Sequence, residues 1–155
     1  MRIWLASAAA LLGAGAVIAQ TIDEEMKPLP GQYQSRLELI SAEIPGMPAN
    51  MTEMMKGMLE RSITICVTPE EVEEGYKEAL RKSQDGECRY NSFTATGGRI
   101  EAEMVCSTDM GEMTMVMSGT GSPTASDVTM QMTGEMGGGP GSMTMRVRQN
   151  RLGDC

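Results

Sequence analysis

The fold is decided between residues 99 and 134, which read RIEAEMVCSTDMGEMTMVMSGTGSPTASDVTMQMTG. Apolar and polar side chains alternate along this stretch, and the alternation breaks only at short clusters rich in Gly, Asp, Ser and Pro. Such alternation is typical of strands with one buried and one solvated face, and strands joined by turns this short must be antiparallel. The predicted inward-facing residues are Ile100, Ala102, Met104, Cys106, Met113, Met115, Met117, Val128, Met130 and Met132.

The same pattern continues on both sides of this stretch, less cleanly in residues 88–96 than in residues 142–152. Residues 88–96 precede a Gly97-Gly98 turn, and residues 142–152 follow the glycine-rich loop 137–141, with Met143, Met145 and Val147 facing inward. That loop lacks the Lys of a phosphate-binding loop, so we interpret it as a hairpin tip. The C-terminal half therefore predicts a β meander with strands at 88–96, 99–107, 112–119, 127–134 and 142–152.

The N-terminal half predicts two further strands and a helix. Residues 31–44 alternate until a Pro-Gly-Met-Pro segment at 45–48, and residues 61–67 alternate again. A helix at about 69–82 is indicated by Thr68 as the N-cap, Pro69 at the first position and Glu71 in a capping box. We expect a mainly β domain over residues 31–155. Its single antiparallel sheet would be a half-open barrel or sandwich-like.

A short second helix is predicted at about 51–59 from a stripe of four methionines, with Asn50 as a candidate N-cap. The favoured interpretation of this stripe is packing against the core, since methionine fills irregular gaps. A less favoured alternative is Cu(I) or Ag(I) binding, because thioethers select soft metals. A third is that flexible methionines line a pocket for an apolar ligand. The stripe comprises Met51, Met54, Met55 and Met58.

The first nineteen residues resemble a secretory signal peptide. Arg2 precedes an uncharged apolar run, and Val17-Ile18-Ala19 supplies small residues before the expected cleavage after Ala19. The run is shorter than a membrane span. We therefore predict a periplasmic protein with no membrane span, in which a loose leader, residues 20–30, precedes the folded domain.

The chain has four cysteines, at 66, 88, 106 and 155. An even number in an exported protein predicts two disulfides, and three pairings are possible. The predicted helix should bring together the strand ends that flank it, which favours Cys66–Cys88. Cys106–Cys155 would then pin the C-terminus.

Composition excludes several function classes. There are 21 acidic side chains against 13 basic ones, which argues against nucleic acid as a partner. The chain contains no His. Catalytic Ser-His and Cys-His pairs and zinc sites that combine Cys with His are therefore excluded. We predict no catalytic residues, no cofactor and no enzyme activity.

Several motifs together resemble one known family. They are Lys27-Pro-Leu-Pro30-Gly31, Pro45-Gly46-Met47-Pro48, Cys66-Val-Thr-Pro-Glu70, Met104-Val-Cys106, the Met-Thr-Met repeats and a terminal Arg151-Leu-Gly-Asp-Cys155. In this order they resemble the exported bacterial family called domain of unknown function 3617, although Tyr33 stands where its members typically carry Trp. The resemblance implies an envelope protein of Gram-negative bacteria. It implies no activity, cofactor or catalytic residue.

We therefore expect a non-enzymatic binding or structural module of the cell envelope, with an apolar ligand or an envelope partner. The alternatives are a carrier of an apolar ligand or lipid and a methionine-rich Cu(I) binder.

Overall fold

The computed structural model of the chain describes residues 20–75, 87–109 and 111–155. The predicted signal peptide, residues 1–19, lies outside the described residues. So do residues 76–82 of the helix predicted at about 69–82. Among the described residues, no helix is both long and apolar enough to cross a membrane.

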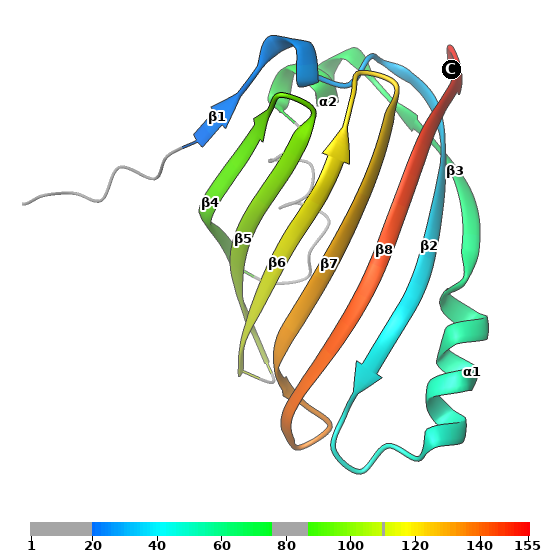
Figure 1. Cartoon of the computed structure of the whole chain (residues 1–155), viewed down its shortest axis with the longest axis vertical. Helices are drawn as coiled ribbons and strands as arrows, with labels where there is room; N and C mark the ends of the chain where they lie inside the picture. The colour runs from blue at the N-terminus through cyan, green and yellow to red at the C-terminus, as the bar shows by residue number, and fades with distance from the viewer. Residues whose placement is uncertain (1–19, 76–86, 110) are drawn as a thin grey trace, which may run out of the picture.

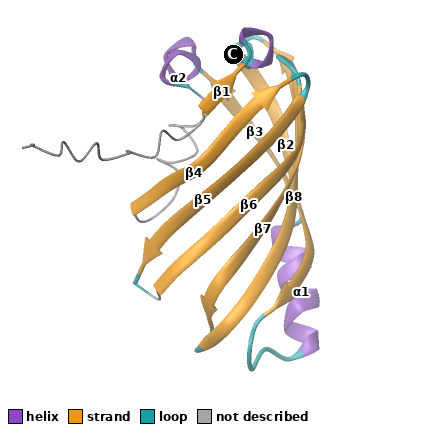
Figure 2. Ribbon diagram, turned by 60° about the vertical axis from the view of Figure 1, so that its left-hand side comes forward, coloured by secondary structure: helices purple, strands orange, loops and turns teal. Residues whose placement is uncertain are grey.

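One eight-stranded sheet dominates the molecule and curves into a half-open barrel (Figures 1 and 2). Its spatial order is β1-β4-β5-β6-β7-β8-β2-β3, so the two edges are formed by short strands from the N-terminal half. The strands are β1 (Gln20–Ile22), β2 (Gly31–Glu43), β3 (Arg61–Val67), β4 (Glu87–Thr96), β5 (Arg99–Thr108), β6 (Gly111–Gly121), β7 (Ala125–Met136) and β8 (Gly139–Gly153).

The predicted meander from β4 to β8 is confirmed, with every neighbouring pair antiparallel. The tight β4–β5 turn places Gly97 and Gly98 at φ of +55° and +80°, and Gly137 and Gly138 at the β7–β8 turn have φ of +65° and +93°. Two consecutive positive φ angles are what the favoured two-residue hairpin turn requires, and glycine adopts them without steric cost.

The meander alone does not complete the sheet. β2 pairs with β8 on one side and with β3 on the other. Leu37 of β2 lies opposite Val147 of β8, and Leu39 lies opposite Met145. Both predicted N-terminal strands are thus confirmed, and the C-terminal strand is central rather than at an edge.

The predicted loose leader is wrong for its first residues. Gln20–Ile22 forms β1, which pairs parallel to β4, so the sheet is mixed rather than purely antiparallel. A 3₁₀ turn, η1 (Glu24–Met26), follows. Asp23 anchors this segment, because its backbone N–H donates to the carbonyl of Ala95 at 2.9 Å and its carboxylate accepts from the Gly97 N–H at 3.0 Å.

Both predicted helices are present, but the one predicted at about 69–82 ends at Glu74, with Gly75 as its C-cap. In α2 (Pro69–Glu74) the capping box is confirmed: the Glu71 N–H donates to the Thr68 hydroxyl at 3.2 Å, and the Thr68 N–H donates to the Glu71 carboxylate at 2.8 Å. The first helix, α1 (Ala49–Leu59), begins two residues earlier than expected. Pro48 is its N-cap and makes no side-chain cap hydrogen bond, so the prediction of Asn50 at this position is wrong.

All four cysteines form disulfides, as predicted, but the predicted pairing is wrong. The bonds join Cys66 to Cys155 and Cys88 to Cys106. The pairing of Cys66 with Cys88 assumed that β3 and β4 are neighbours, whereas β3 is one edge of the sheet and β4 lies near the opposite edge. Cys88 instead faces Cys106 directly across the β4–β5 pair.

The hydrophobic core lies on the concave face of the sheet and is densest over β4, β5 and β6. Phe93 and Met104 are the largest fully buried side chains. The rings of Tyr90 and Phe93 pack edge to face, with centroids 5.6 Å apart. Aromatic pairs favour this arrangement over a face-to-face one.

Candidate ligand-binding cavity

The register of the meander arranges the inward-facing methionines in two rows across the concave face. Each methionine lies opposite another on the neighbouring strand, which is the closest side-chain contact that a sheet provides. One row is Met104, Met115, Met132 and Met143, and the other is Met117, Met130 and Met145.

Burial changes along these rows. The methionines of β5 and β6 are buried, whereas those of β7 and β8 are only half-buried. The apolar lining of the half-barrel is therefore fully covered on one side and partly open on the other. The buried methionines of β5 and β6 thus belong to a packed core, and the half-buried ones of β7 and β8 form a surface on which an apolar ligand can lie.

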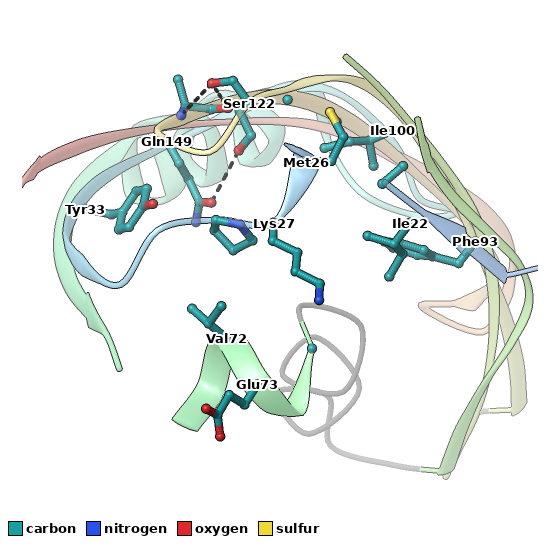
Figure 3. Close-up of a pocket in the computed structure, with 16 residues that line it drawn as sticks. Ile22, Met26, Lys27, Tyr33, Val72, Glu73, Phe93, Ile100, Ser122 and Gln149 are labelled. Carbon is teal, nitrogen blue, oxygen red and sulfur yellow. Dashed lines mark hydrogen bonds between the residues drawn. The ribbon is translucent and has the colours of Figure 1, made fainter. Parts of the chain in front are cut away.

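A cavity of about 100 Å³ lies at the end of the concave face near β1 and the β6–β7 turn (Figure 3). Ile22 and Met26 form part of its wall beside Phe93 of β4 and Ile100 of β5, and Val72 of α2 lies across from them. The Ile22–Met26 segment that the leader prediction treated as loose is thus an essential part of the wall.

A second cavity, of about 90 Å³, continues the first one towards the methionine rows. Phe93, Ile100, Ser126 and Gln149 line both cavities. The second is otherwise lined by Met117, Val128, Met130 and Val147. The two cavities together form an apolar groove, which we call the concave groove, from Ile22 to Met130.

Polar side chains around the concave groove are few. The Ser126 hydroxyl donates to the side-chain oxygen of Gln149 at 3.3 Å. Lys27 and Glu73 also border the first cavity, and Lys27 forms an ion pair with the exposed Glu24 at 2.8 Å. This composition, a mainly apolar lining with a few polar groups, is typical of small-molecule binding sites.

Tyr33 fixes the wall opposite Ile22. Its hydroxyl lies 2.7 Å from the Leu29 carbonyl and 2.9 Å from the Pro123 carbonyl, so it shares its proton between two acceptors and ties β2 to the β6–β7 turn. Burial raises the pKa of the Tyr33 phenol, and the nearby Arg151 guanidinium opposes part of this rise. The phenol is therefore a neutral structural donor at physiological pH.

Arg151 holds the start of β2 in place behind Tyr33. Its Nε and Nη2 donate to the Pro30 carbonyl at 3.0 and 2.8 Å, and Nη2 also donates to Asp154 at 2.6 Å. Gly31 makes this arrangement possible, because a Cβ there would lie 2.3 Å from the Gly153 carbonyl oxygen. The terminal Arg-Leu-Gly-Asp-Cys segment thus fixes the start of β2 beside Tyr33.

The predicted methionine site lies elsewhere. All four stripe residues are on α1, which lies beside β2 along one edge of the sheet and does not line the concave groove (Figure 1). Met51, Met54 and Met58 are 48%, 61% and 57% exposed, and Met55 is half-buried. The favoured prediction that this stripe packs into the core is therefore wrong for three of its four members.

No His, Cys, Asp or Glu cluster suited to a metal ion occurs within residues 20–75, 87–109 and 111–155. The sequence contained no direct signal for the cavity lining, because Ile22, Tyr33, Phe93 and Ile100 come from four strands that only the sheet order brings together. The alternation did mark Ile100 as inward-facing.

Residues 28–155 match a family model described as "Protein of unknown function (DUF3617)". No curated protein and no solved structure matches the chain at the level of a recognisable relative.

Proposed function

Because this chain belongs to the DUF3617 family of proteins of unknown function, we propose a function from its own geometry: it is a non-enzymatic periplasmic binding protein that holds an apolar chain in the concave groove. The observation that carries this proposal is the continuity of two apolar cavities with half-buried methionines. An acyl chain of a lipid or fatty acid fits this description.

Hydrophobic burial supplies enough free energy for such a ligand. Each methylene group removed from water contributes about 0.8 kcal/mol, so burying about ten methylenes corresponds to the roughly 8 kcal/mol of micromolar binding. Met130 and Met117 at its far end are flexible and adapt to chains of different shape. The scarcity of polar groups argues for selection by apolarity rather than by a specific pattern of hydrogen bonds.

Two further observations support the periplasm as the location. Both disulfides are compatible with an oxidising compartment, where such bonds persist. The apolar N-terminal run ending at Ala19 has the form of a cleavable export signal. Mature protein from the envelope should begin at Gln20, and an intact Met1 on that protein would contradict export.

The experiment measures binding of a fluorescent long-chain fatty acid to the mature protein. Ser126→Phe should weaken binding strongly, because Ser126 faces inward from β7 and lines both cavities. Ser118→Phe is the matched control, since Ser118 is exposed on the opposite face of the sheet. It should bind as the wild type does.

Native mass spectrometry of protein purified from its own periplasm provides the second measurement. A lipid-sized added mass that is lost in Ser126→Phe supports the proposal. Absence of fatty-acid binding by the wild type, or equal binding by a folded Ser126→Phe variant, would overturn it. Circular dichroism establishes that both variants are folded.

A further inference from the structure

The exposed methionines of α1 are a feature that the concave groove does not use. At an exposed helical position a thioether gains little from the core, and three such side chains lie within two turns: Met51, Met54 and Met58. Each is about half exposed. Packing therefore does not account for this stripe.

Their spacing places the three side chains next to one another on one helical face. Met54 lies three residues after Met51 and four before Met58, and side chains at these separations have Cβ atoms about 5–6 Å apart. Met54 is thus the central member, with a flexible thioether within reach on either side. The sulfur of Met47 accepts a hydrogen bond from the Thr52 hydroxyl at 3.8 Å, so we leave it out of the donor set.

Donor chemistry favours a soft ion at this face. The chain contains no His, and all four cysteines are held in disulfides. Thioether sulfur is therefore the only soft donor available, and thioethers select Cu(I) among biological metals. An apolar docking face would be served equally well by leucine, which forms helices at least as readily as methionine. Leucine is absent from this stripe.

We propose that Met51, Met54 and Met58 form a surface site for one soft monovalent ion, Cu(I), for which Ag(I) is a redox-inert substitute. The site is separate from the concave groove, so its existence does not depend on the proposed ligand. Three neutral thioethers at an exposed helix surface would make it an exchangeable site, in which the metal enters and leaves without opening the fold.

Ag(I) titration of the mature, disulfide-bonded protein tests this assignment, with the methionine methyl groups labelled with ¹³C and followed by NMR. The methyl resonances of Met51, Met54 and Met58 should shift together and saturate at one equivalent of Ag(I). Single Met→Leu substitutions assign these resonances. Binding of Cu(I) under ascorbate, in competition with a chromophoric Cu(I) chelator, extends the test to the biological ion.

The combined variant M51L/M54L/M58L should lose the bound ion while retaining its circular dichroism spectrum, because leucine preserves volume and helix propensity. M130L/M132L/M145L is the matched control: it removes three half-buried methionines of the sheet and should still bind the ion. Failure of the wild type to bind Ag(I), or retention of the ion by M51L/M54L/M58L, would overturn the proposal. So would resonance shifts confined to the sheet methionines.

Discussion

Cys66 and Cys155 are bonded to each other although their strands, β3 and β8, are not neighbours in the sheet. Both strands flank β2, and Gln32 of β2 lies opposite Cys66 on one side and Gly153 on the other. The disulfide therefore passes over the beginning of β2 and joins the strands on its two sides. It binds the C-terminus to the edge strand of the sheet.

The two disulfides should contribute differently to stability. The chain between Cys66 and Cys155 spans 89 residues, and that between Cys88 and Cys106 spans 18. In the chain-entropy model, loops of these sizes correspond to about 4–5 and about 3 kcal/mol of unfolding free energy. Urea unfolding of the double Cys→Ala variants should rank them in that order. A larger loss on removing Cys88–Cys106 would contradict this account.

Two glycines should respond in opposite directions to alanine. Gly31→Ala should destabilise the protein by more than about 1 kcal/mol, since Gly31 has φ of +145° and a Cβ there would collide with the backbone oxygen of Gly153. Gly57→Ala should stabilise it by about 0.5–1 kcal/mol, because Gly57 lies inside α1 with nothing within 4 Å of an added Cβ. Thermal unfolding distinguishes the two effects. A neutral Gly31→Ala would show that the Arg151 anchor is not as tight as its contacts indicate.

The ion pair of Asp127 and Arg146 gives a small pH-dependent contribution. Arg146 donates from Nε and Nη2 to the two carboxylate oxygens at 2.7 and 2.5 Å, and this bonding lowers the pKa of Asp127 below its ordinary value. A lowered folded-state pKa means that the stabilisation is present above the unfolded pKa of about 4 and is lost as pH falls through the folded pKa. Both side chains are more than one-third exposed, so solvent screening keeps the effect small.

A double-mutant cycle with Asp127→Asn and Arg146→Gln measures this contribution directly. The coupling free energy should be favourable at pH 7 and should decrease as the pH falls through the lowered folded-state pKa of Asp127. Coupling that does not decrease as the carboxyl becomes protonated would mean that shape or packing, rather than charge, joins the two residues.

Local patterns were sufficient to predict the meander, because four of its five strands alternate cleanly and each turn is short. In β4 the alternation changes at a bulge between Tyr90 and Ser92. Thr68 and Glu71 likewise predicted the start of α2 through a capping box that needs no distant partner. Such features depend on residues a few positions apart, and the sequence displays them directly.

Long-range order could not be predicted in the same way. Nothing in the alternation of β2 indicates that Leu37 will lie opposite Val147 of β8, and a three-residue strand such as β1 is too short to show a period. The disulfide pairing and the concave groove both follow from the sheet order. The disulfide pairing was predicted wrongly, and Ile22 was not recognised as part of the cavity wall, for the same reason: the sheet order could not be read from local patterns.

Oxidation by hydrogen peroxide should divide the methionines by exposure. Each reaction transfers one oxygen atom to a thioether and releases water, and the peroxide must reach the sulfur. Met54 and Met58 on α1 should therefore be oxidised first, the half-buried Met130 and Met145 later, and the buried Met104 last. Sulfoxide at α1 should leave the melting temperature almost unchanged, because those side chains are not in the core. Oxidation of Met104 would place a polar group in the core and should lower the melting temperature sharply.

Peptide mass spectrometry during a peroxide time course, beside a sample in concentrated urea, measures the order in which the methionines are oxidised. The folded protein should show three distinct rates and the unfolded protein one. Equal rates for Met54 and Met104 in the folded protein would show that the concave face is open to solvent, and the burial gradient on which the concave groove depends would then be wrong.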